Sequence, residues 1–285
     1  MTPFEVKPQS YEWLPTADVG PYLTDPEWVM EQKLDGVRCL VRWANGAPQF
    51  LQRSGGKLTH AASALHFEAL TEALSPLCGL SRETVVLLDC ELIPGTGTLW
   101  VFDLPWFGSV GAPMCSTADP FEDRREWLRS LFETLVLPES VRLVEQARTE
   151  AEKARLLEAV EFLGIEGVVL KRLAAGYSSG KRTADVLKVK FYREADCIVI
   201  ARNTGGALNA TLAVYGDDGL IEVGGTSMIG KPDAPVGAVV EIKYLYVGNG
   251  GRLYQPTLLR VRTDKAPEEC RVEQLVSVNR EVLTI

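Results

Sequence analysis

The sequence predicts an α+β chain of two domains, the first with antiparallel sheets and flanking helices and the second a small β-barrel. Its length of 285 residues is enough for two domains with a substantial core. Before Phe191, apolar strand-like runs alternate with amphipathic helical segments, whereas short strands with glycine turns follow it. We therefore place the boundary near residue 192, which gives domains of residues 1–192 and 193–285.

The composition is that of a soluble globular protein, with 46% apolar and 24% charged residues. No apolar run is long enough to span a membrane, and the start of the chain lacks a signal-peptide pattern. The six cysteines are scattered without a C-x-x-C pair, which argues against structural zinc and for a reduced cytosolic setting. Because there are only two histidines, we expect catalysis to depend on lysine, arginine and carboxylates.

In the first domain we expect an irregular lead-in over residues 1–30, followed by strands and helices. The strand that delivers Lys33 begins at Trp28–Met30. The further expected strands are Cys39–Trp43 and Gln49–Leu51 joined by an Asn45-Gly46 turn, then Thr84–Leu88, Leu99–Phe102, Gly167–Leu170 and Val186–Lys190. The expected helices are residues 59–77, 119–135 and 148–163.

In the second domain short β-branched runs are separated by glycine turns. The expected strands are Cys197–Ala201, Leu212–Tyr215, Ile221–Val223 and Val239–Tyr244, with turns at Asp217–Gly219 and Gly248–Gly251. A segment of roughly 95 residues with such short strands and glycine turns has the size of an OB-fold barrel. The pattern alone leaves a β-sandwich open.

The most informative stretch is Lys33–Arg38, which reads K-L-D-G-V-R. An ammonium is unreactive, so a nucleophilic lysine must lose its proton and meet a neutralised phosphate. Asp35 and Arg38 are close enough in sequence to share a pocket with Lys33, and Gly36 lets the backbone approach a ligand. In isolation, a solvated charged turn explains this stretch equally well.

Carboxylates stand at the ends of expected strands. Asp89 and Glu91 alternate, which places them on one face, and Glu166 precedes an apolar strand. A lone acidic residue at such a position is usually exposed to solvent and simply marks the end of the strand. Several acids that converge near a reactive lysine would instead hold a divalent cation and the ribose hydroxyls of a nucleotide.

Phe102 and two lysines extend the same interpretation. Phe102 is either a core aromatic residue or a platform that stacks on a purine. Lys188 and Lys190 alternate on one face, where two cations suit a polyphosphate better than a core. The residues alone thus indicate a nucleotide-phosphate site with a lysine nucleophile.

The net charge of −8 is unusual for a protein that binds nucleic acid, but the basic residues are clustered. Between residues 171 and 190, six lysines and arginines face one acid, a local balance of +5. Phosphate binding depends on such a local patch, whereas the global charge mainly affects long-range steering. The acidic total argues against tight non-specific DNA binding without excluding a phosphate site.

Taken together, the ordered motifs resemble the covalent nucleotidyltransferases, which comprise ATP-dependent DNA ligases, RNA ligases and mRNA capping guanylyltransferases. The signature K-x-D-G-x-R is Lys33–Arg38, and the last stretch is close to the final motif of DNA ligases of the eukaryotic and phage kind. The remaining matches are Gln52–Lys57, Asp89–Glu91, Phe102–Asp103, Glu166–Val169, Gly180–Thr183, Lys188–Lys190 and, for the final motif, Arg260–Glu268.

The resemblance implies a nucleotidyltransferase (adenylation) domain followed by an OB-fold, and a three-step sealing reaction. Lys33 would attack the α-phosphate of ATP, the AMP would pass to the 5′-phosphate of a nick, and the 3′-hydroxyl would then displace AMP. The residues implied to be catalytic are Lys33, Asp35, Arg38, Lys188 and Lys190. Those implied to bind the nucleotide are Glu31, Arg38, Arg53, Glu91, Phe102, Val168, Lys188, Lys190, Arg260, Arg262 and Lys265.

Individual roles follow from the same resemblance. Glu91 would hold the ribose, Phe102 would stack on adenine, and Lys188 and Lys190 would grip the α-phosphate. Glu166, together with Glu91, would bind Mg²⁺ or Mn²⁺. Arg260, Arg262 and Lys265 would orient pyrophosphate when the second domain closes.

The implied partner is nicked duplex DNA. Asp35 and Arg38 would act on the 3′ side of the nick and Arg53 would recognise the 5′-phosphate. The residues expected to contact DNA are Arg38, Arg53, Lys171, Arg172, Lys181 and Arg182. We expect a monomeric, minimal two-domain ligase of bacterial or phage type in the bacterial cytosol or the phage-infected host, with no membrane association. Val186 departs from the family, since many relatives have tryptophan there.

Three other functions compete with the DNA ligase hypothesis. An RNA ligase shares the first five motifs but usually lacks the arginine-rich ending at Arg260–Lys265. A capping guanylyltransferase would use GTP. An inactive nucleic-acid-binding module would have lost Lys33 or Glu166, and both are present.

Overall fold

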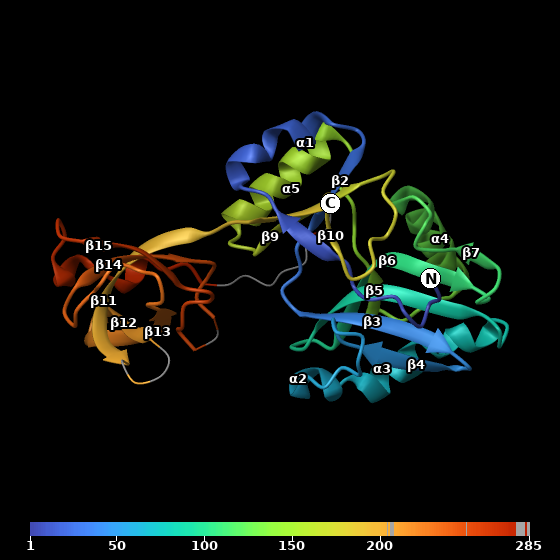
Figure 1. The fold of residues 1–285 in the computed structure, drawn as a ribbon, viewed down its shortest axis with the longest axis horizontal. Coiled ribbons are helices and arrows are strands. Elements are labelled where there is room, and N and C mark those ends of the chain that lie inside the picture. Colours follow the sequence, from blue (N-terminus) through green and yellow to red (C-terminus); the bar gives the residue numbers. More distant parts are fainter. Residues whose placement is uncertain (204, 206–207, 249, 278–282, 284–285) are drawn as a thin grey trace. The chain divides into compact units, whose positions relative to one another are not determined.

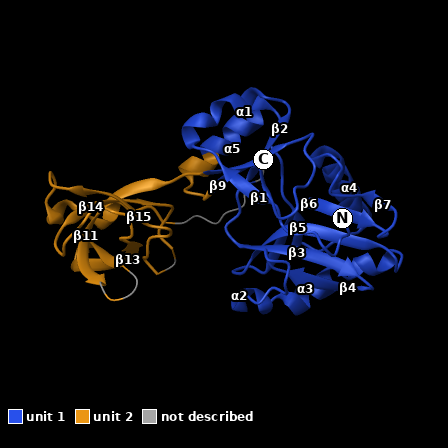
Figure 2. Cartoon of the chain, viewed as in Figure 1, with its two compact units in different colours: residues 1–158, 167–189, 282–285 blue, residues 159–166, 190–281 orange. Residues whose placement is uncertain are grey.

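The computed structural model describes residues 1–285 except 204, 206–207, 249, 278–282 and 284–285. The chain forms two compact units (Figure 2). Unit 1 holds residues 1–158, 167–189 and 282–285, and unit 2 holds residues 159–166 and 190–281. The chain thus enters unit 2 at Lys190, two residues before the predicted boundary, and residues 159–166 also group with unit 2.

The larger sheet of unit 1 has the order β4-β3-β5-β6-β7, with β8 paired in parallel to β6 (Figure 1). Its strands are β3 (Val37–Ala44), β4 (Ala47–Leu51), β5 (Val85–Ile93), β6 (Thr98–Gly108), β7 (Pro113–Cys115) and β8 (Val141–Leu143). The predicted hairpin between β3 and β4 is confirmed. Asn45 and Gly46 have φ angles of 54° and 80°, as a tight turn between twisted strands requires.

The smaller sheet of unit 1 has the order β1-β10-β9-β2. Its strands are β1 (Ser10–Trp13), β2 (Trp28–Gln32), β9 (Gly167–Arg172) and β10 (Arg182–Lys190). The predicted irregular lead-in over residues 1–30 is therefore wrong in part. β1 pairs in parallel with β10, and α1 (Gly20–Thr24) has Pro21 in its first turn, where proline is tolerated in a helix.

The helices between β4 and β9 agree with the predicted helical segments, with one exception. α4 (Phe121–Thr134) and α5 (Glu150–Phe162) lie where the sequence predicted them. The single helix predicted over residues 59–77 is broken into α2 (Ala61–Ala64), α3 (Phe67–Ala73) and a 3₁₀ turn at Ser75–Gly79. The break falls at Leu65 and His66, where His66 Nε2 lies 2.7 Å from the carbonyl oxygen of Pro94.

Two predicted strands extend further than their apolar runs suggested. β5 continues through Asp89 to Ile93, and β6 continues through Asp103 to Gly108. Both aspartates are fully buried, so the predicted strand ends at these acids are wrong. Each carboxylate has an arginine partner inside the protein, which is why a strand can carry it through the interior.

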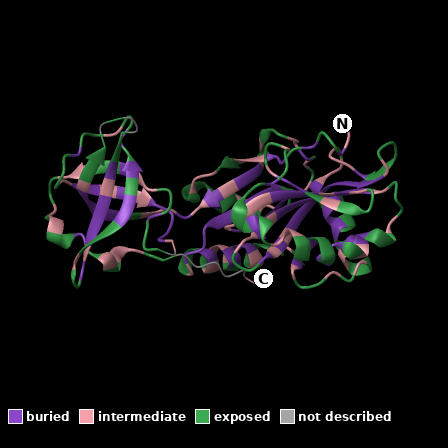
Figure 3. Cartoon of the chain, turned by 90° about the horizontal axis from the view of Figure 1, so that it is seen from below, coloured by how far each residue is buried: buried purple, intermediate pink, exposed green. Residues whose placement is uncertain are grey.

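The main core of unit 1 lies between the larger sheet and its helices (Figure 3). Alternate residues of β5, from Val86 to Leu92, point into it, because side chains alternate along a strand. Leu70 of α3 and Leu128 of α4 cover them. On the opposite face of β5, Leu87 packs in a second buried cluster and Asp89 accepts a hydrogen bond from Arg38.

Unit 2 contains a five-stranded sheet in the order β13-β12-β11-β14-β15, whose four strand pairs are antiparallel. Its strands are β11 (Arg193–Asn203), β12 (Asn209–Gly216), β13 (Gly219–Ser227), β14 (Val239–Tyr244) and β15 (Thr257–Arg262). Its main core combines β-branched side chains with leucines and Tyr244, and a smaller buried cluster contains Ile198, Val239 and Cys270. Among the described residues, no helix is both long and apolar enough to cross a membrane.

Candidate active site

Lys33 is held at the end of a completely buried strand. All five residues of β2 are buried, and the backbone N–H of Lys33 donates to the carbonyl oxygen of Gly167 at 2.9 Å. The next residue, Leu34, packs with Phe102 and Val144. The side chain of Lys33 is half-buried. The strand therefore fixes this lysine at a defined position, where a solvated turn would leave it mobile.

Gly36 brings the signature stretch against β5. A Cβ atom at this position would lie 2.4 Å from the carbonyl oxygen of Leu92 and 2.8 Å from Cδ1 of Ile93. Only glycine fits this approach without displacing the strand. The glycine of K-L-D-G-V-R thus serves a close contact within the protein.

Arg38 forms a bidentate ion pair with Asp89. Its Nε and Nη2 atoms each lie 2.6 Å from a carboxylate oxygen, and the hydroxyl of Tyr177 donates to the same carboxylate at 2.5 Å. Burial opposes the charged form of Arg38, but Asp89 outweighs it and raises the pKa of the guanidinium. The same burial, reinforced by Asp89, raises the pKa of Tyr177. Asp89 thus fixes the orientation of Arg38.

Two cations lie near the ring of Phe102. The guanidinium carbon of Arg38 is 4.8 Å from the ring centroid, and Nζ of Lys171 is 4.6 Å from it. The ring is 7% exposed. Cations over an aromatic face are attracted by its quadrupole, so this ring has a strongly cationic setting.

Lys171 corrects a prediction. It was expected to contact DNA, but its side chain is 2% exposed and its Nζ lies 2.6 Å from Oε2 of Glu31. Gln146 donates to the other oxygen of Glu31 at 2.8 Å. Burial lowers the pKa of Lys171, and Glu31 opposes this effect. A lysine so enclosed cannot reach a DNA phosphate, so the predicted role is wrong.

Two arginines of α4 were missed by the sequence analysis. Arg124 makes a bidentate pair with Asp103, at 2.8 and 3.0 Å, and both side chains are 1% exposed. Arg125 donates to the carbonyl oxygen of Val144, while its Nε and Nη1 have no hydrogen-bond partner in the described structure. Burial lowers the pKa of Arg125 to about 10. Both arginines share the helical spacing of Phe121, Leu128 and Leu131, a signal that they belong to the buried face.

Two further predicted site residues, Glu166 and Lys190, belong to unit 2 and contact each other. Glu166 precedes β9, and Lys190 is the last residue of β10; their side chains form an ion pair at 2.8 Å. Burial opposes the charged form of Lys190, but Glu166 outweighs it and raises the pKa of this lysine. Glu166 is 5% exposed, so this carboxylate is an oxygen donor in a mostly dry environment.

The remaining predicted site residues lie on β5, β9 and β10 and in the loop after Lys33. Glu91 is half-buried on β5 and pairs in register with Arg38 of β3. Val168 is fully buried on β9 opposite Gln32. Lys188 is half-buried on β10, and its carbonyl oxygen accepts from the N–H of Leu14. Asp35 is half-buried in the loop after Lys33.

The predicted DNA contacts differ in exposure. Arg53 donates to Oγ of Ser10 at 2.6 Å, and together with Arg38 and Gly36 it lines a hollow of about 720 Å³. Lys181 and Arg182 are exposed at the start of β10. Arg172 is also exposed, but Glu27 at 3.3 Å and Asp185 at 3.9 Å partly neutralise it.

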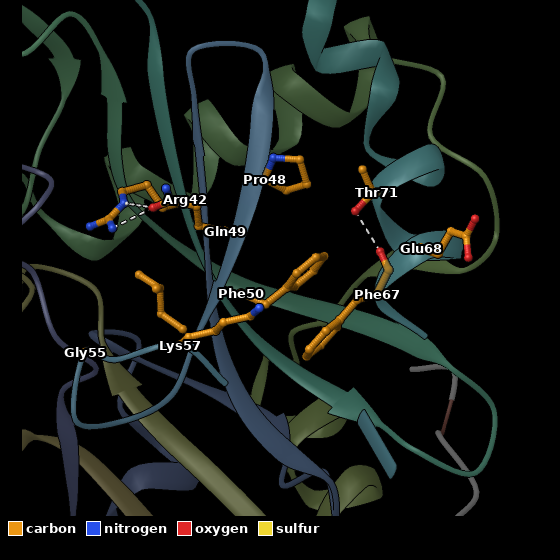
Figure 4. A pocket seen from close by; sticks show the side chains of 10 residues that line it. Arg42, Pro48, Gln49, Phe50, Gly55, Lys57, Phe67, Glu68 and Thr71 are labelled. Carbon is orange, nitrogen blue, oxygen red and sulfur yellow. Dashed lines mark hydrogen bonds between the residues drawn. The ribbon is translucent and has the colours of Figure 1, made fainter. Parts of the chain in front are cut away.

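A second hollow of about 670 Å³ opens beside β4 and α3 (Figure 4). The rings of Phe50 and Phe67 stack there, with centroids 4.6 Å apart and planes at 5°. Arg42 lies at its edge and donates twice to Oε1 of Gln49. The loop after β4 borders both hollows, since Gly55 and Lys57 line this one and Arg53 lines the other.

The final motif lies in unit 2, with every cation paired to an acid. Arg260 pairs with Glu241, Arg262 pairs with Asp196 and Asp264, and Lys265 pairs with Asp196. The structure thus places Arg260, Arg262 and Lys265 in one cluster at the end of β15, while Lys33 belongs to unit 1.

Unit 1 thus presents a lysine at the end of a buried strand, and unit 2 carries a cluster of cations that are paired to acids. Residues 96–190 match the family described as ATP dependent DNA ligase domain. The match to this family model over residues 96–190, together with the similarity to DNA ligase C1, confirms the resemblance predicted from the motifs.

Curated relatives agree with this family. DNA ligase C1 of Mycolicibacterium smegmatis is 28% identical over 279 residues, which cover 88% of this chain and 77% of the relative. The multifunctional non-homologous end joining protein LigD of the same species is 25% identical over 85% of this chain. The chain spans only 37% of LigD.

Solved structures share the fold. A mycobacterial DNA ligase D complexed with ATP and MES has a TM-score of 0.56 and 22% identity, and covers 95% of this chain and 99% of its own. A Lig E DNA ligase, described as binding DNA with a minimal scaffold, has a TM-score of 0.61 and 20% identity, with coverage of 90% and 99%. At these identities the likeness concerns the fold alone.

Proposed function

We propose that this chain is an ATP-dependent DNA ligase that seals nicks in duplex DNA through a covalent lysyl-AMP at Lys33. The amine of Lys33 attacks the α-phosphorus of ATP; a P–N bond forms and pyrophosphate leaves. The 5′-phosphate of the nick then takes the AMP from the lysine. Finally the 3′-hydroxyl attacks this activated phosphate, which joins the strands and releases AMP.

The placement of Lys33 carries the proposal. Its backbone is bound to Gly167 at the end of a buried strand, and Leu34 beside it packs on Phe102. A nucleophile gains rate when it is held close to its target, because the entropy of positioning is lost during folding. The relatives that share this core over most of their length are named DNA ligases.

The nucleotide contacts are part of the same proposal. Phe102 would stack on adenine, with Glu31 and Val168 close in register on β2 and β9. Glu91 would hold the ribose, and Lys188 and Lys190 would bind the α-phosphate. Because Arg38 now lies over the ring of Phe102, an adenine on that face would require the guanidinium to move.

A divalent cation suits this site. Mg²⁺ is usually held by one or two carboxylates together with substrate phosphates, and the buried carboxylate of Glu166 is such a donor. When bound, the ion would supply positive charge that neutralises the phosphates. A contribution from Glu91 is part of the same proposal.

We further propose that unit 2 is an OB-fold that closes on unit 1 in the first step. The order of its strands supports this assignment, as do two links between the region before β15 and β13. Leu253 N donates to Val223 O at 2.8 Å, and Thr226 Oγ1 donates to Pro256 O at 3.1 Å. Closure would bring Arg260, Arg262 and Lys265 to the pyrophosphate.

The test is incubation with α-labelled ATP and Mg²⁺, followed by a denaturing gel and mass analysis of the labelled peptide. We expect AMP on Lys33, no label on a folded Lys33→Ala variant, and transfer of the label to a nicked duplex. Label from GTP alone would indicate a capping enzyme. Absence of label with both nucleotides would overturn the covalent mechanism.

The nucleic-acid substrate needs its own measurement. After labelling, the protein is offered a nicked DNA duplex or a nicked RNA duplex of the same sequence. We expect sealing of the DNA nick by a monomeric protein. Sealing of RNA alone would move the function to an RNA ligase.

A further inference from the structure

One buried carboxylate joins two cations of the final motif. Asp196 accepts from Nζ of Lys265 at 2.7 Å and from Nη1 of Arg262 at 3.2 and 3.3 Å. The side chain of Asp196 is 12% exposed, whereas those of the two cations are about a fifth exposed. The acid thus lies beneath the cations and is covered by them.

The position of Asp196 is fixed by its backbone. It lies on β11 opposite Glu241 of β14, and Gln274 holds it from both sides. The amide oxygen of Gln274 accepts from the N–H of Asp196 at 2.9 Å, and its amide nitrogen donates to the Asp196 carbonyl at 2.9 Å. The strand pairing and the two hydrogen bonds to Gln274 fix the position of the Asp196 carboxylate. They therefore also fix where Arg262 and Lys265 lie.

The electrostatic role of Asp196 is clear from its surroundings. Arg262 and Lys265 are like charges that repel each other, and the carboxylate that they share offsets that repulsion. The hydrogen bond to Asp196 raises the pKa of Lys265. Asp264 takes Nε and Nη2 of Arg262, both at 2.8 Å, but Asp264 is mostly exposed. Of these two acids, only Asp196 also binds Lys265, so it is the one that joins the two cations.

Lys265 also keeps capacity for a ligand. An ammonium has three donors, and Asp196 accepts from one of them. A phosphate could accept from the others without breaking the pair. Two cations that share one carboxylate can both bind a pyrophosphate group, whose oxygens are negatively charged acceptors.

We propose that Asp196 is a positioning residue for the first step of the reaction: it holds Arg262 and Lys265 together as the pair that receives the departing pyrophosphate. The inference deepens the proposed function and rests on it. No pyrophosphate is formed when AMP passes to the nick or when the strands join. Asp196 therefore acts on lysyl-AMP formation alone.

The experiment compares two reactions of Asp196→Asn in the full chain. Asparagine keeps the shape of the aspartate side chain and the backbone hydrogen bonds to Gln274, but it removes the negative charge. Single-turnover formation of lysyl-AMP from labelled ATP is expected to slow by about tenfold, with a higher ATP concentration at half-maximal rate. Sealing of a nick that already carries 5′-AMP is expected to stay within about twofold of wild type.

Two controls make the result specific. Glu222→Gln removes an acid of unit 2 that pairs with exposed Arg252 at 2.8 Å, and it should change neither reaction. In a Lys265→Ala background, Asp196→Asn should slow lysyl-AMP formation much less than it does alone, because one partner is already gone. Thermal unfolding of each variant monitors folding.

Unchanged lysyl-AMP formation in Asp196→Asn would overturn the inference, and so would an equal loss in both reactions. Failure of the proposed function would look different, because the wild-type chain would then take no label from ATP. Adding pyrophosphate to the labelled protein provides a second measurement, the rate of the reverse reaction. Release of the label as ATP should be slower in Asp196→Asn than in wild type.

Discussion

Nζ of Lys171 lies 2.6 Å from Oε2 of Glu31 inside unit 1, and both side chains are at most 3% exposed. The two residues come from neighbouring strands, β9 and β2, and the second of these leads directly to Lys33. The ion pair is thus part of the support for the strand that presents the nucleophile.

Breaking this pair from one side should destabilise the protein strongly. Lys171→Met leaves the Glu31 carboxylate buried with Gln146 as its neutral donor, so we expect a loss of about 3–5 kcal/mol in the free energy of unfolding. Urea denaturation monitored by tryptophan fluorescence measures it.

The double variant Glu31→Gln/Lys171→Met is the informative comparison. Since it removes both charges, it should be clearly less destabilised than the sum of the two single variants. Additive losses would show that the two charges do not interact, in conflict with the geometry.

Gly36→Ala should disable the first step through space alone. The added methyl group would overlap the carbonyl oxygen of Leu92, so the stretch that carries Lys33 must shift away from β5. Because a displacement of about 1 Å can reduce a reaction rate by about 10²-fold, we expect lysyl-AMP formation to fall by that order. Labelling with ATP in a single turnover measures the rate.

Gly20→Ala is the matched control for this substitution. Nothing lies within 4 Å of a Cβ atom at Gly20, and the residue begins α1, where alanine is favourable. It should label like wild type. If Gly36→Ala also did so, the close contact with β5 would have no part in placing the lysine.

The sequence predicted local features of this fold well and distant ones poorly. The Asn45-Gly46 hairpin depends on two positive φ angles that neighbouring residues specify, and it was found as predicted. β1 was missed because its partner is β10, some 170 residues later in the chain, and nothing near Ser10 indicates that pairing.

The candidate site shows the same division. Lys33 to Arg38 could be found from spacing, because the chemistry requires those residue types together. Lys171 was assigned to the surface, since a charged residue in a basic run usually lies there, yet its partner Glu31 is supplied by a different strand. Arg124 and Arg125 were missed for the same reason, although their helical spacing with Phe121 placed them on the buried face.

Acid should weaken the buried pair of Asp103 and Arg124. Burial favours the protonated form of Asp103, but Arg124 outweighs it and lowers the pKa of this carboxyl below its ordinary value of 3.8. A lowered pKa in the folded state means that the stabilisation is complete above the unfolded value. It is lost as the pH falls through the lower, folded value.

Asp103→Asn isolates this contribution, since Arg124 then stays buried without its counter-charge. We expect the variant to be less stable by about 3 kcal/mol or more near neutral pH, with the gap to wild type closing below about pH 4. Urea unfolding across the acid range measures the gap. Glu139→Gln, whose exposed acid pairs with Arg142, should change little at any pH, and a constant gap for Asp103→Asn would contradict the assignment.

The salt dependence of binding to nicked duplex should separate the cations of the basic run. Lys181 and Arg182 are exposed and lack an ion pair among the described residues, so each can neutralise a DNA phosphate. Replacing either by alanine should reduce the slope of log affinity against log salt by about 0.9, because one fewer counterion is released. Arg172→Ala should have a smaller effect, since Glu27 and Asp185 already offset its charge.

Lys171→Met provides the internal comparison, because it removes a cation that no phosphate can reach. Measured under conditions where the variant is folded, its slope should equal that of wild type. A reduced slope for Lys171→Met would mean that this lysine leaves Glu31 to meet DNA. An unchanged slope for both Lys181→Ala and Arg182→Ala would remove the start of β10 from the DNA-binding surface and leave the hollow lined by Arg38 and Arg53 as its centre.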